Sequence, residues 1–185
     1  MLTVIRPKRT RRVRLAEWVL VIFLAVLASI VIRTFIFQTF SIPSKSMKPT
    51  LYVGDRIIID KLSVDFGAIN IGDVIVFKAP KDVAADCGDP VTDLVKRVVG
   101  LPGDHLTSKG NTIYVNNQPL KENWSHWEPL GSAIGDVVVP ANQYFVMGDN
   151  HFNSCDSRTW GTVPRSNIIG KAFLRFWPLS RFSWF

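Results

Sequence analysis

The chain has 185 residues, of which 47% are hydrophobic and 11% aromatic, so it can bury one good core and is too short for two large domains. The formal net charge is +7, but residues 1–14 hold six of the 22 basic residues and none of the 15 acidic ones, which leaves 16 bases against 15 acids. This nearly neutral remainder gives no support to a phosphate-binding surface, and no nucleic-acid partner is expected.

An apolar segment follows the basic tail of residues 1–14. Residues 18–32 carry no charge, and the apolar character resumes after Arg33. At about 1.5 Å per helical residue, residues 15–37 reach about 30 Å, which spans a bilayer if Arg33 extends toward the headgroups. We therefore predict a single transmembrane helix at residues 15–37.

A cleavable signal peptide is the rival interpretation, because it also has a basic region followed by an apolar one. However, the sequence "RTFIFQTFSIP" is bulky where a small-x-small cleavage site would stand, which favours the anchor. Basic residues flank membrane spans on the cytoplasmic side, so the tail is expected in the cytoplasm and residues 38–185 outside it. The prediction is a single-pass protein of the plasma membrane, with the lipid bilayer as a partner.

Short β-branched runs separated by Gly, Asp, Asn and Pro follow the apolar segment, among them "DRIIID", "GDVIVFKAP" and "NTIYVNNQPL". No long segment of helical period occurs after residue 40. The predicted fold class is mainly β: one transmembrane helix, then an exported all-β catalytic domain at residues 38–185. Residues 81–93 and 121–135 contain turn-forming residues and are predicted to be exposed excursions from the sheet.

Two features of the exported part leave alternatives open. Cys87 and Cys155 lie where thiols oxidise, so they form either a disulfide or two free thiols, and spacing alone does not decide. The C-terminal stretch "FLRFWPLSRFSWF", residues 173–185, is aromatic with two arginines. Its first half suits a core strand, and its second half suits either the membrane interface or ordinary packing.

The segment "IPSKSMKPTL", residues 42–51, brings two serines and two lysines together. Residues that precede proline avoid the helical region, so the segment is expected to be extended, with Ser44 and Ser46 on one face and Lys45 on the other. Lys48 shares the face of Ser46, but nothing apolar beside it would desolvate its amine. An ordinary lysine, with a pKa of about 10.4, is no base at neutral pH.

A basic lysine must be kept neutral by burial or by a cationic neighbour, and "DLVKRVVGLPGD" supplies both features. Lys96 shares its strand face with Leu94 and Val98, and Arg97 is adjacent on the opposite face. The alternative is an edge strand whose lysine prevents aggregation.

The loop "MGDNHFNSCDSRTWG", residues 147–161, is dense in side-chain donors and acceptors, which suits a network that holds a site rigid. It lacks the EF-hand calcium pattern. His151 could be the base of a Ser-His-Asp triad with Asp149 or Asp156, but this would leave Lys96 buried without a role. The histidines and cysteines show no zinc spacing, so neither a metal nor a cofactor is expected.

Together, these segments resemble the type I signal peptidases, membrane-anchored serine proteases with a Ser-Lys dyad. Four motifs match in order: "IPSKSMKPTLYVGD", "GDVIVFK", "KRVVGLPGD" and "GDNHFNSCDSRTWG". The resemblance covers nearly everything from residue 36 onward. It departs from the common pattern at His151, Phe152 and Cys155, which lie outside the positions that match the family's functional residues.

The resemblance implies a role for each matching residue. Ser46 corresponds to the nucleophile and Lys96 to the general base, the same pair that the residues themselves favour. Ser44 corresponds to the hydroxyl that joins the Ser46 N–H in the oxyanion hole. The expected supporting network consists of Ser154, which would orient the lysine amine, the ion pair of Asp156 with Arg158, and Arg97 and Asp149.

The resemblance also implies the substrate: signal-peptide-bearing preproteins, cut after a small residue in a small-x-small pattern through an acyl-enzyme. Two other hypotheses are a non-catalytic, membrane-tethered β module that binds peptides or membrane surface, and a self-cleaving Ser-Lys transcriptional regulator. The regulator would need a DNA-binding N-terminal domain where this chain has its apolar segment.

Overall fold

The structure, a computed structural model, describes residues 11–80, 87, 92–125 and 129–185, excluding the side chains of residues 11–14 and 34. Most of the predicted basic tail and most of the predicted excursion at residues 81–93 lie outside the described residues. The chain divides into two compact units, Met1–Ile36 and Phe37–Phe185.

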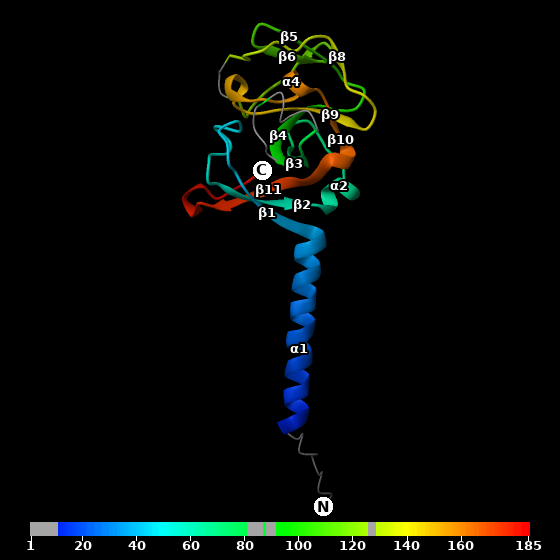
Figure 1. The fold of residues 1–185 in the computed structure, drawn as a ribbon, viewed down its shortest axis with the longest axis vertical. Helices are drawn as coiled ribbons and strands as arrows, with labels where there is room; N and C mark the ends of the chain where they lie inside the picture. The colour runs from blue at the N-terminus through cyan, green and yellow to red at the C-terminus, as the bar shows by residue number, and fades with distance from the viewer. Residues whose placement is uncertain (1–10, 81–86, 88–91, 126–128) are drawn as a thin grey trace, which may run out of the picture. The chain divides into compact units, whose positions relative to one another are not determined.

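The described part of the first unit is helical. Helix α1, Arg11–Val31, continues as a π-helical turn, Ile32–Ile36 (Figure 1). Large apolar side chains from Leu15 to Ile32 are exposed along it. Among the residues searched, those that the structure describes, no helix is both long and apolar enough to cross a membrane. The transmembrane span at residues 15–37 therefore stays a prediction.

The second unit is mainly β, as predicted. Its larger sheet has the order β1-β2-β11-β3-β4-β9-β10, with β12 also paired to β11, and the pairings are antiparallel. The strands are β1 Phe37–Ser41, β2 Arg56–Asp60, β3 Val74–Lys78, β4 Asp93–Gly100, β9 Gln143–Met147, β10 Val163–Pro164, β11 Ile168–Trp177 and β12 Ser183–Trp184.

A smaller sheet lies in the chain between β4 and β9. Its order is β7-β6-β5-β8, from β5 His105–Lys109, β6 Thr112–Val115, β7 Gln118–Pro119 and β8 Val137–Val138. Asn116 and Asn117 both have positive φ angles, 51° and 64°, which is the geometry of a tight two-residue hairpin turn. The predicted excursion at residues 121–135 follows this hairpin.

Short helical turns complete the part of this unit that the structure describes. They are α2 Leu62–Asp65, α4 Ser157–Trp160, and three 3₁₀ turns at His151–Asn153, Arg165–Asn167 and Leu179–Arg181.

One hydrophobic cluster fixes the segment that carries Ser46. Met47 and Leu51 are buried with Ile57 and Ile59 of β2 and with apolar residues of β3. The Leu51 N–H donates to the Met47 carbonyl at 2.8 Å, so the chain turns immediately after Ser46. The prediction of an extended segment is wrong here, because burying both Met47 and Leu51 requires a turn.

The C-terminal aromatic stretch divides where the sequence suggested. Its first half belongs to β11, and Phe173 contacts the rings of Phe37 and Trp184. In the second half, Phe182 is 52% exposed and Trp184 is 67% exposed. Ordinary packing therefore accounts for the first half and leaves large apolar surfaces of the second half open.

Candidate active site

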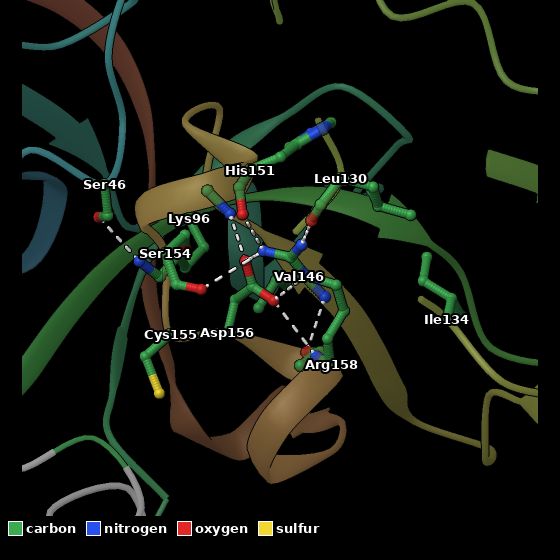
Figure 2. A network of polar contacts seen from close by, with 12 residues as sticks. Ser46, Lys96, Leu130, Ile134, Val146, His151, Ser154, Cys155, Asp156 and Arg158 are labelled. Carbon is green, nitrogen blue, oxygen red and sulfur yellow. Dashed lines mark hydrogen bonds and ion pairs between the residues drawn. The ribbon is translucent and has the colours of Figure 1, made fainter. Parts of the chain in front are cut away.

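Ser46 and Lys96 meet in the second unit. Lys96 Nζ lies 2.8 Å from Ser46 Oγ, although 50 residues separate them in the chain (Figure 2). Lys96 is 3% exposed and Ser46 is 9% exposed. The turn after β1 supplies the serine and β4 supplies the lysine, so the fold brings together the two residues that the sequence paired.

Among the described residues, strand β4 has a strand partner on one side at Lys96 and on both sides only from Arg97 onward. It pairs with β3 over Asp93–Arg97, where Lys96 lies opposite Ile75, and with β9 from Arg97 onward. A lysine that prevents aggregation at an edge extends its amine into solvent, whereas the Lys96 side chain is buried and its amine contacts Ser46, so the structure does not favour that alternative.

Burial lowers the pKa of Lys96 from 10.5 to about 8. Desolvation is the main cause; the positive charge of Arg158 lowers the pKa further, while the negative charges of Asp156 and Asp149 raise it. With this pKa, about a tenth of the molecules carry the neutral amine at pH 7, and this neutral form is the one that a general base requires.

Arg97 does not act as the cationic neighbour that the sequence suggested. Its guanidinium donates to both carboxylate oxygens of Asp149, at 2.8 and 2.7 Å, and to the Gly72 carbonyl at 2.6 Å. The ring of Trp124 covers it at 4.8 Å. Adjacent positions of a strand point to opposite faces, so Arg97 holds Asp149 while Lys96 faces Ser46.

Ser44 lies beside the nucleophile as expected. Its Oγ is 3.2 Å from Ser46 Oγ. The chain bends at Ser44 and Lys45 instead of running straight, yet the two hydroxyls still face each other. Ser44 is exposed, so its hydroxyl is accessible to a bound substrate.

The loop after β9 clamps the nucleophile turn. The Asn150 backbone N–H donates to the Ser46 carbonyl at 3.0 Å, and the Asn150 side-chain amide donates to the Lys45 carbonyl at 3.3 Å. Asn150 Oδ1 also accepts from the Asn153 N–H at 3.1 Å and caps the following 3₁₀ turn. Sequence reasoning counted Asn150 only as one polar residue of the loop, because a backbone contact across about a hundred positions leaves no local pattern.

Asp156 and Arg158 form the ion pair that the resemblance implied. Arg158 Nε and Nη2 donate to the two Asp156 carboxylate oxygens, each at 2.8 Å, and both side chains are buried. Arg158 also donates to the backbone carbonyls of His151 and Leu130. Asp156 accepts from the Gly148 N–H at 3.1 Å, and the pair thus fixes the loop beside Lys96 (Figure 2).

Ser154 packs closely against this centre. A Cβ placed on Gly148 would lie 2.3 Å from Ser154 Oγ and 2.4 Å from the Ser46 carbonyl oxygen, so position 148 accommodates only glycine without displacement. Ser154 Oγ is buried, and no hydrogen bond to it is found among the described residues. The expected hydrogen bond from Ser154 to the Lys96 amine is therefore not part of this arrangement. Gly148 is a second residue whose importance the sequence alone did not reveal.

His151 does not face the nucleophile. It is 5% exposed, and its Nε2 lies 3.2 Å from Glu122 Oε1 in the segment between β7 and β8. Asp149 is engaged by Arg97 and Asp156 by Arg158, so neither completes a triad with His151.

Cys87 and Cys155 form a disulfide with a Cα–Cα distance of 6.0 Å. Of the two alternatives that the sequence left open, the structure has the bonded one. The bridge joins the connection between β3 and β4 to the loop that carries Ser154 and Asp156. The structure shows no group of three His, Cys, Asp or Glu side chains placed to hold a metal ion among the described residues.

Residues 15–177 match the family described as signal peptidase, peptidase S26. The chain is 42% identical over 167 residues to a signal peptidase I of Leptolyngbya laminosa, covering 90% of this chain and 82% of that protein. It is 36% identical over 225 aligned residues to a signal peptidase I of Mycobacterium tuberculosis, covering 95% and 76%. A crystal structure of a signal peptidase I from Enterococcus faecalis is 28% identical, with a TM-score of 0.46, and covers 56% of this chain and 96% of that chain.

Proposed function

The chain belongs to the signal peptidase family, peptidase S26, whose members are serine endopeptidases that remove signal peptides, and on that premise we propose that it does so with a Ser46–Lys96 dyad. The observation that carries the proposal is the 2.8 Å contact between Lys96 Nζ and Ser46 Oγ, with both side chains buried. Because this is a family of enzymes, a non-catalytic β module is not the function that we propose.

Acylation begins with the neutral amine of Lys96. It accepts the proton of the Ser46 hydroxyl while Oγ attacks the scissile carbonyl, and the protonated amine then delivers this proton to the leaving amine. The lowered pKa of Lys96, about 8, supports both transfers, since the group can bind and release a proton near neutral pH. Water then hydrolyses the acyl-enzyme, with Lys96 again as the base.

The tetrahedral intermediate needs donors for its oxyanion. Ser44 Oγ–H and the Ser46 backbone N–H are the groups that we assign to this role, and the 3.2 Å distance between the two hydroxyl oxygens supports it. A donor of this kind is worth about 3 to 4 kcal/mol of the barrier. The clamp from Asn150 to the Ser46 carbonyl supports a fixed orientation of that N–H.

Substrates are proposed to be preproteins cut after a small residue in the small-x-small pattern. A cavity of about 220 Å³ next to the dyad supports an extended binding mode: it is lined by residues 40–44 at the end of β1 and 92–96 at the start of β4. In the described residues, the edge of β4 at Asp93–Lys96 that faces away from β3 has no strand partner. An extended peptide can add to this edge through main-chain hydrogen bonds.

We also propose that the N-terminal unit anchors the enzyme in the plasma membrane, with its N-terminus in the cytoplasm and the β domain outside. Exposed apolar side chains lie along α1 and the first residue of the π-helical turn, from Leu15 to Ile32, where Glu17 is the one charged residue of that stretch of the sequence. A helix with such an extensive apolar surface needs a non-aqueous environment. The basic residues before it support the orientation. The exposed Phe182 and Trp184 are suited to the lipid headgroup region.

The test is processing of a preprotein by the detergent-solubilised full-length chain. We expect removal of the signal peptide at a small-x-small site and its loss in Ser46→Ala. Processing that survives Ser46→Ala would refute the proposed nucleophile, and absence of processing by the unaltered protein would refute the function.

A further inference from the structure

Two cavities meet at the dyad. The first is the substrate cavity of about 220 Å³ described above. The second, of about 170 Å³, is lined by Lys45, Asn153 and the disulfide pair Cys87 and Cys155. The residues that line both cavities are Ser44, Ser46, Leu94 and Lys96. The reacting atoms therefore lie on the boundary between the cavities.

The strand edges determine which part of a peptide each cavity receives. If the proposed function holds, the residues before the cleaved bond pair with the open edge of β4 in the first cavity, and the scissile carbonyl lies at Ser46. The chain that continues past Ser46 Oγ then enters the second cavity, which offers a mixed polar and sulfur surface.

The disulfide gives this second cavity a rigid wall. Cys155 lies between Ser154, packed against Gly148, and Asp156, held by Arg158. Cys87 is the other end of the bridge, in the connection that leads into β4. A wall made of packed side chains can shift to admit a larger group, but a covalent bridge fixed to a buried ion pair cannot separate.

We propose that the Cys87–Cys155 disulfide determines specificity on the leaving-group side: it forms the wall of a subsite for the first residue after the cleaved bond and restricts that residue to small side chains. The inference rests on the proposed function but concerns the other side of the scissile bond from the small-x-small pattern. It gives the disulfide a role in substrate selection that is separate from its effect on stability.

The experiment compares two pairs of preproteins with the full-length enzyme. One pair differs only at the first residue after the cleaved bond, Ala against Phe, and the other pair differs only at the third residue before it, Ala against Val. The readout is the ratio of kcat/KM within each pair, because a general loss of stability lowers both members equally. Wild type is expected to prefer Ala after the bond by about tenfold or more, the range for one pocket.

Two variants change the wall in opposite directions. Cys87→Ser with Cys155→Ser opens the cavity and should reduce the Ala/Phe ratio by about fivefold, whereas Asn153→Leu narrows it and should increase the ratio. The Ala/Val ratio of the second pair of preproteins should stay the same in both variants. An Ala/Phe ratio that stays within about twofold of wild type would overturn the inference, and Asn153→Leu alone decides if the double variant does not fold. Failure of the wild type to process any substrate would instead overturn the proposed function.

Discussion

Lys96 Nζ and Ser46 Oγ lie 2.8 Å apart. Ser46 belongs to a turn that packs on one hydrophobic cluster, and Lys96 belongs to β4, which lies between β3 and β9 in the order of the larger sheet. Each side chain is held by its own element. The Met47 and Leu51 side chains fix the turn in the core, and β3 and β9 fix β4. The contact is therefore preorganised, which is what proton transfer in a single step requires.

The pH dependence follows from the pKa of Lys96, lowered to about 8. The base must be neutral, so protonation below this pKa removes activity, and kcat/KM should rise with pH and level off above about 8. One unit below the pKa, about a tenth of the molecules carry the neutral amine. Initial rates with a substrate that has no titrating group between pH 6 and 9 measure the profile. A flat profile, or one that falls across this range, would contradict the assignment.

The charges of Asp156 and Arg158 act on Lys96 in opposite directions. The carboxylate raises the lysine pKa and the guanidinium lowers it. Asp156→Asn should therefore move the midpoint of the pH profile to lower pH, and Arg158→Gln should move it to higher pH, each by about half a unit or more.

Both substitutions also break a buried pair, at a cost of about 3 to 5 kcal/mol of stability, so the profiles are recorded below the unfolding temperature of each variant. Loss of stability alone would leave both midpoints at the wild-type pH. Shifts in the same direction would show that the two charges do not act on Lys96 as described.

Gly148 tests the packing between the loop and the nucleophile turn. In Gly148→Ala, the added methyl would meet Ser154 Oγ and the Ser46 carbonyl at 2.3 and 2.4 Å, so the turn must shift. We expect about 1 to 3 kcal/mol of destabilisation and about a hundredfold loss of kcat. Thermal unfolding and steady-state kinetics measure both effects.

Gly135→Ala is the matched control, since no atom of the described residues beyond its two chain neighbours is found within 4 Å of a Cβ built there. It should change stability by less than about 0.5 kcal/mol and leave kcat unaltered. Equal activities of the two alanine variants would show that the contact at Gly148 does not position Ser46.

The membrane anchor is tested by alkaline carbonate extraction. The full-length protein should stay in the membrane pellet. Replacing Leu24 and Leu27 of α1 by lysine should release it, because each charge at the centre of a span costs about 3 kcal/mol. Val138→Lys, at a 64% exposed position of β8, is the control and should stay in the pellet. Extraction of the unaltered protein into the supernatant would contradict the anchor.

The sequence predicted those features of the fold and the site that depend mainly on neighbouring residues. The β-branched runs indicated the strands, and a lysine between Leu94 and Val98 indicated a buried amine, which lies 3% exposed at the site. The bend at Ser44 and Lys45 was not predictable, because it follows from the burial of Met47 and Leu51 against β2.

Contacts between segments far apart in the sequence account for the other differences between the predicted site and the structure. The partner of Arg97 is Asp149, 52 residues away, and nothing in the strand sequence distinguishes this pairing from a charge placed to lower the lysine pKa. The part of β4 that has a partner on both sides is set by β9, which pairs with it only from Arg97 onward. The disulfide forms because the loop after β9 brings Cys155 next to Cys87. These are properties of the assembled sheet and not of any single window of sequence.

The most direct test of the central claim is the rate of preprotein cleavage by Lys96→Ala, measured beside Ser46→Ala and Lys48→Ala. When two catalytic residues act as one unit, removing either one lowers the rate to a similar extent. The cleavage rate of Lys96→Ala should therefore be at least about 10³-fold below that of wild type and close to that of Ser46→Ala. Lys48, whose Nζ lies over the Tyr52 ring at 5.1 Å, should be dispensable. Cleavage by Lys96→Ala within tenfold of wild type, or an equal loss in Lys48→Ala, would contradict the dyad.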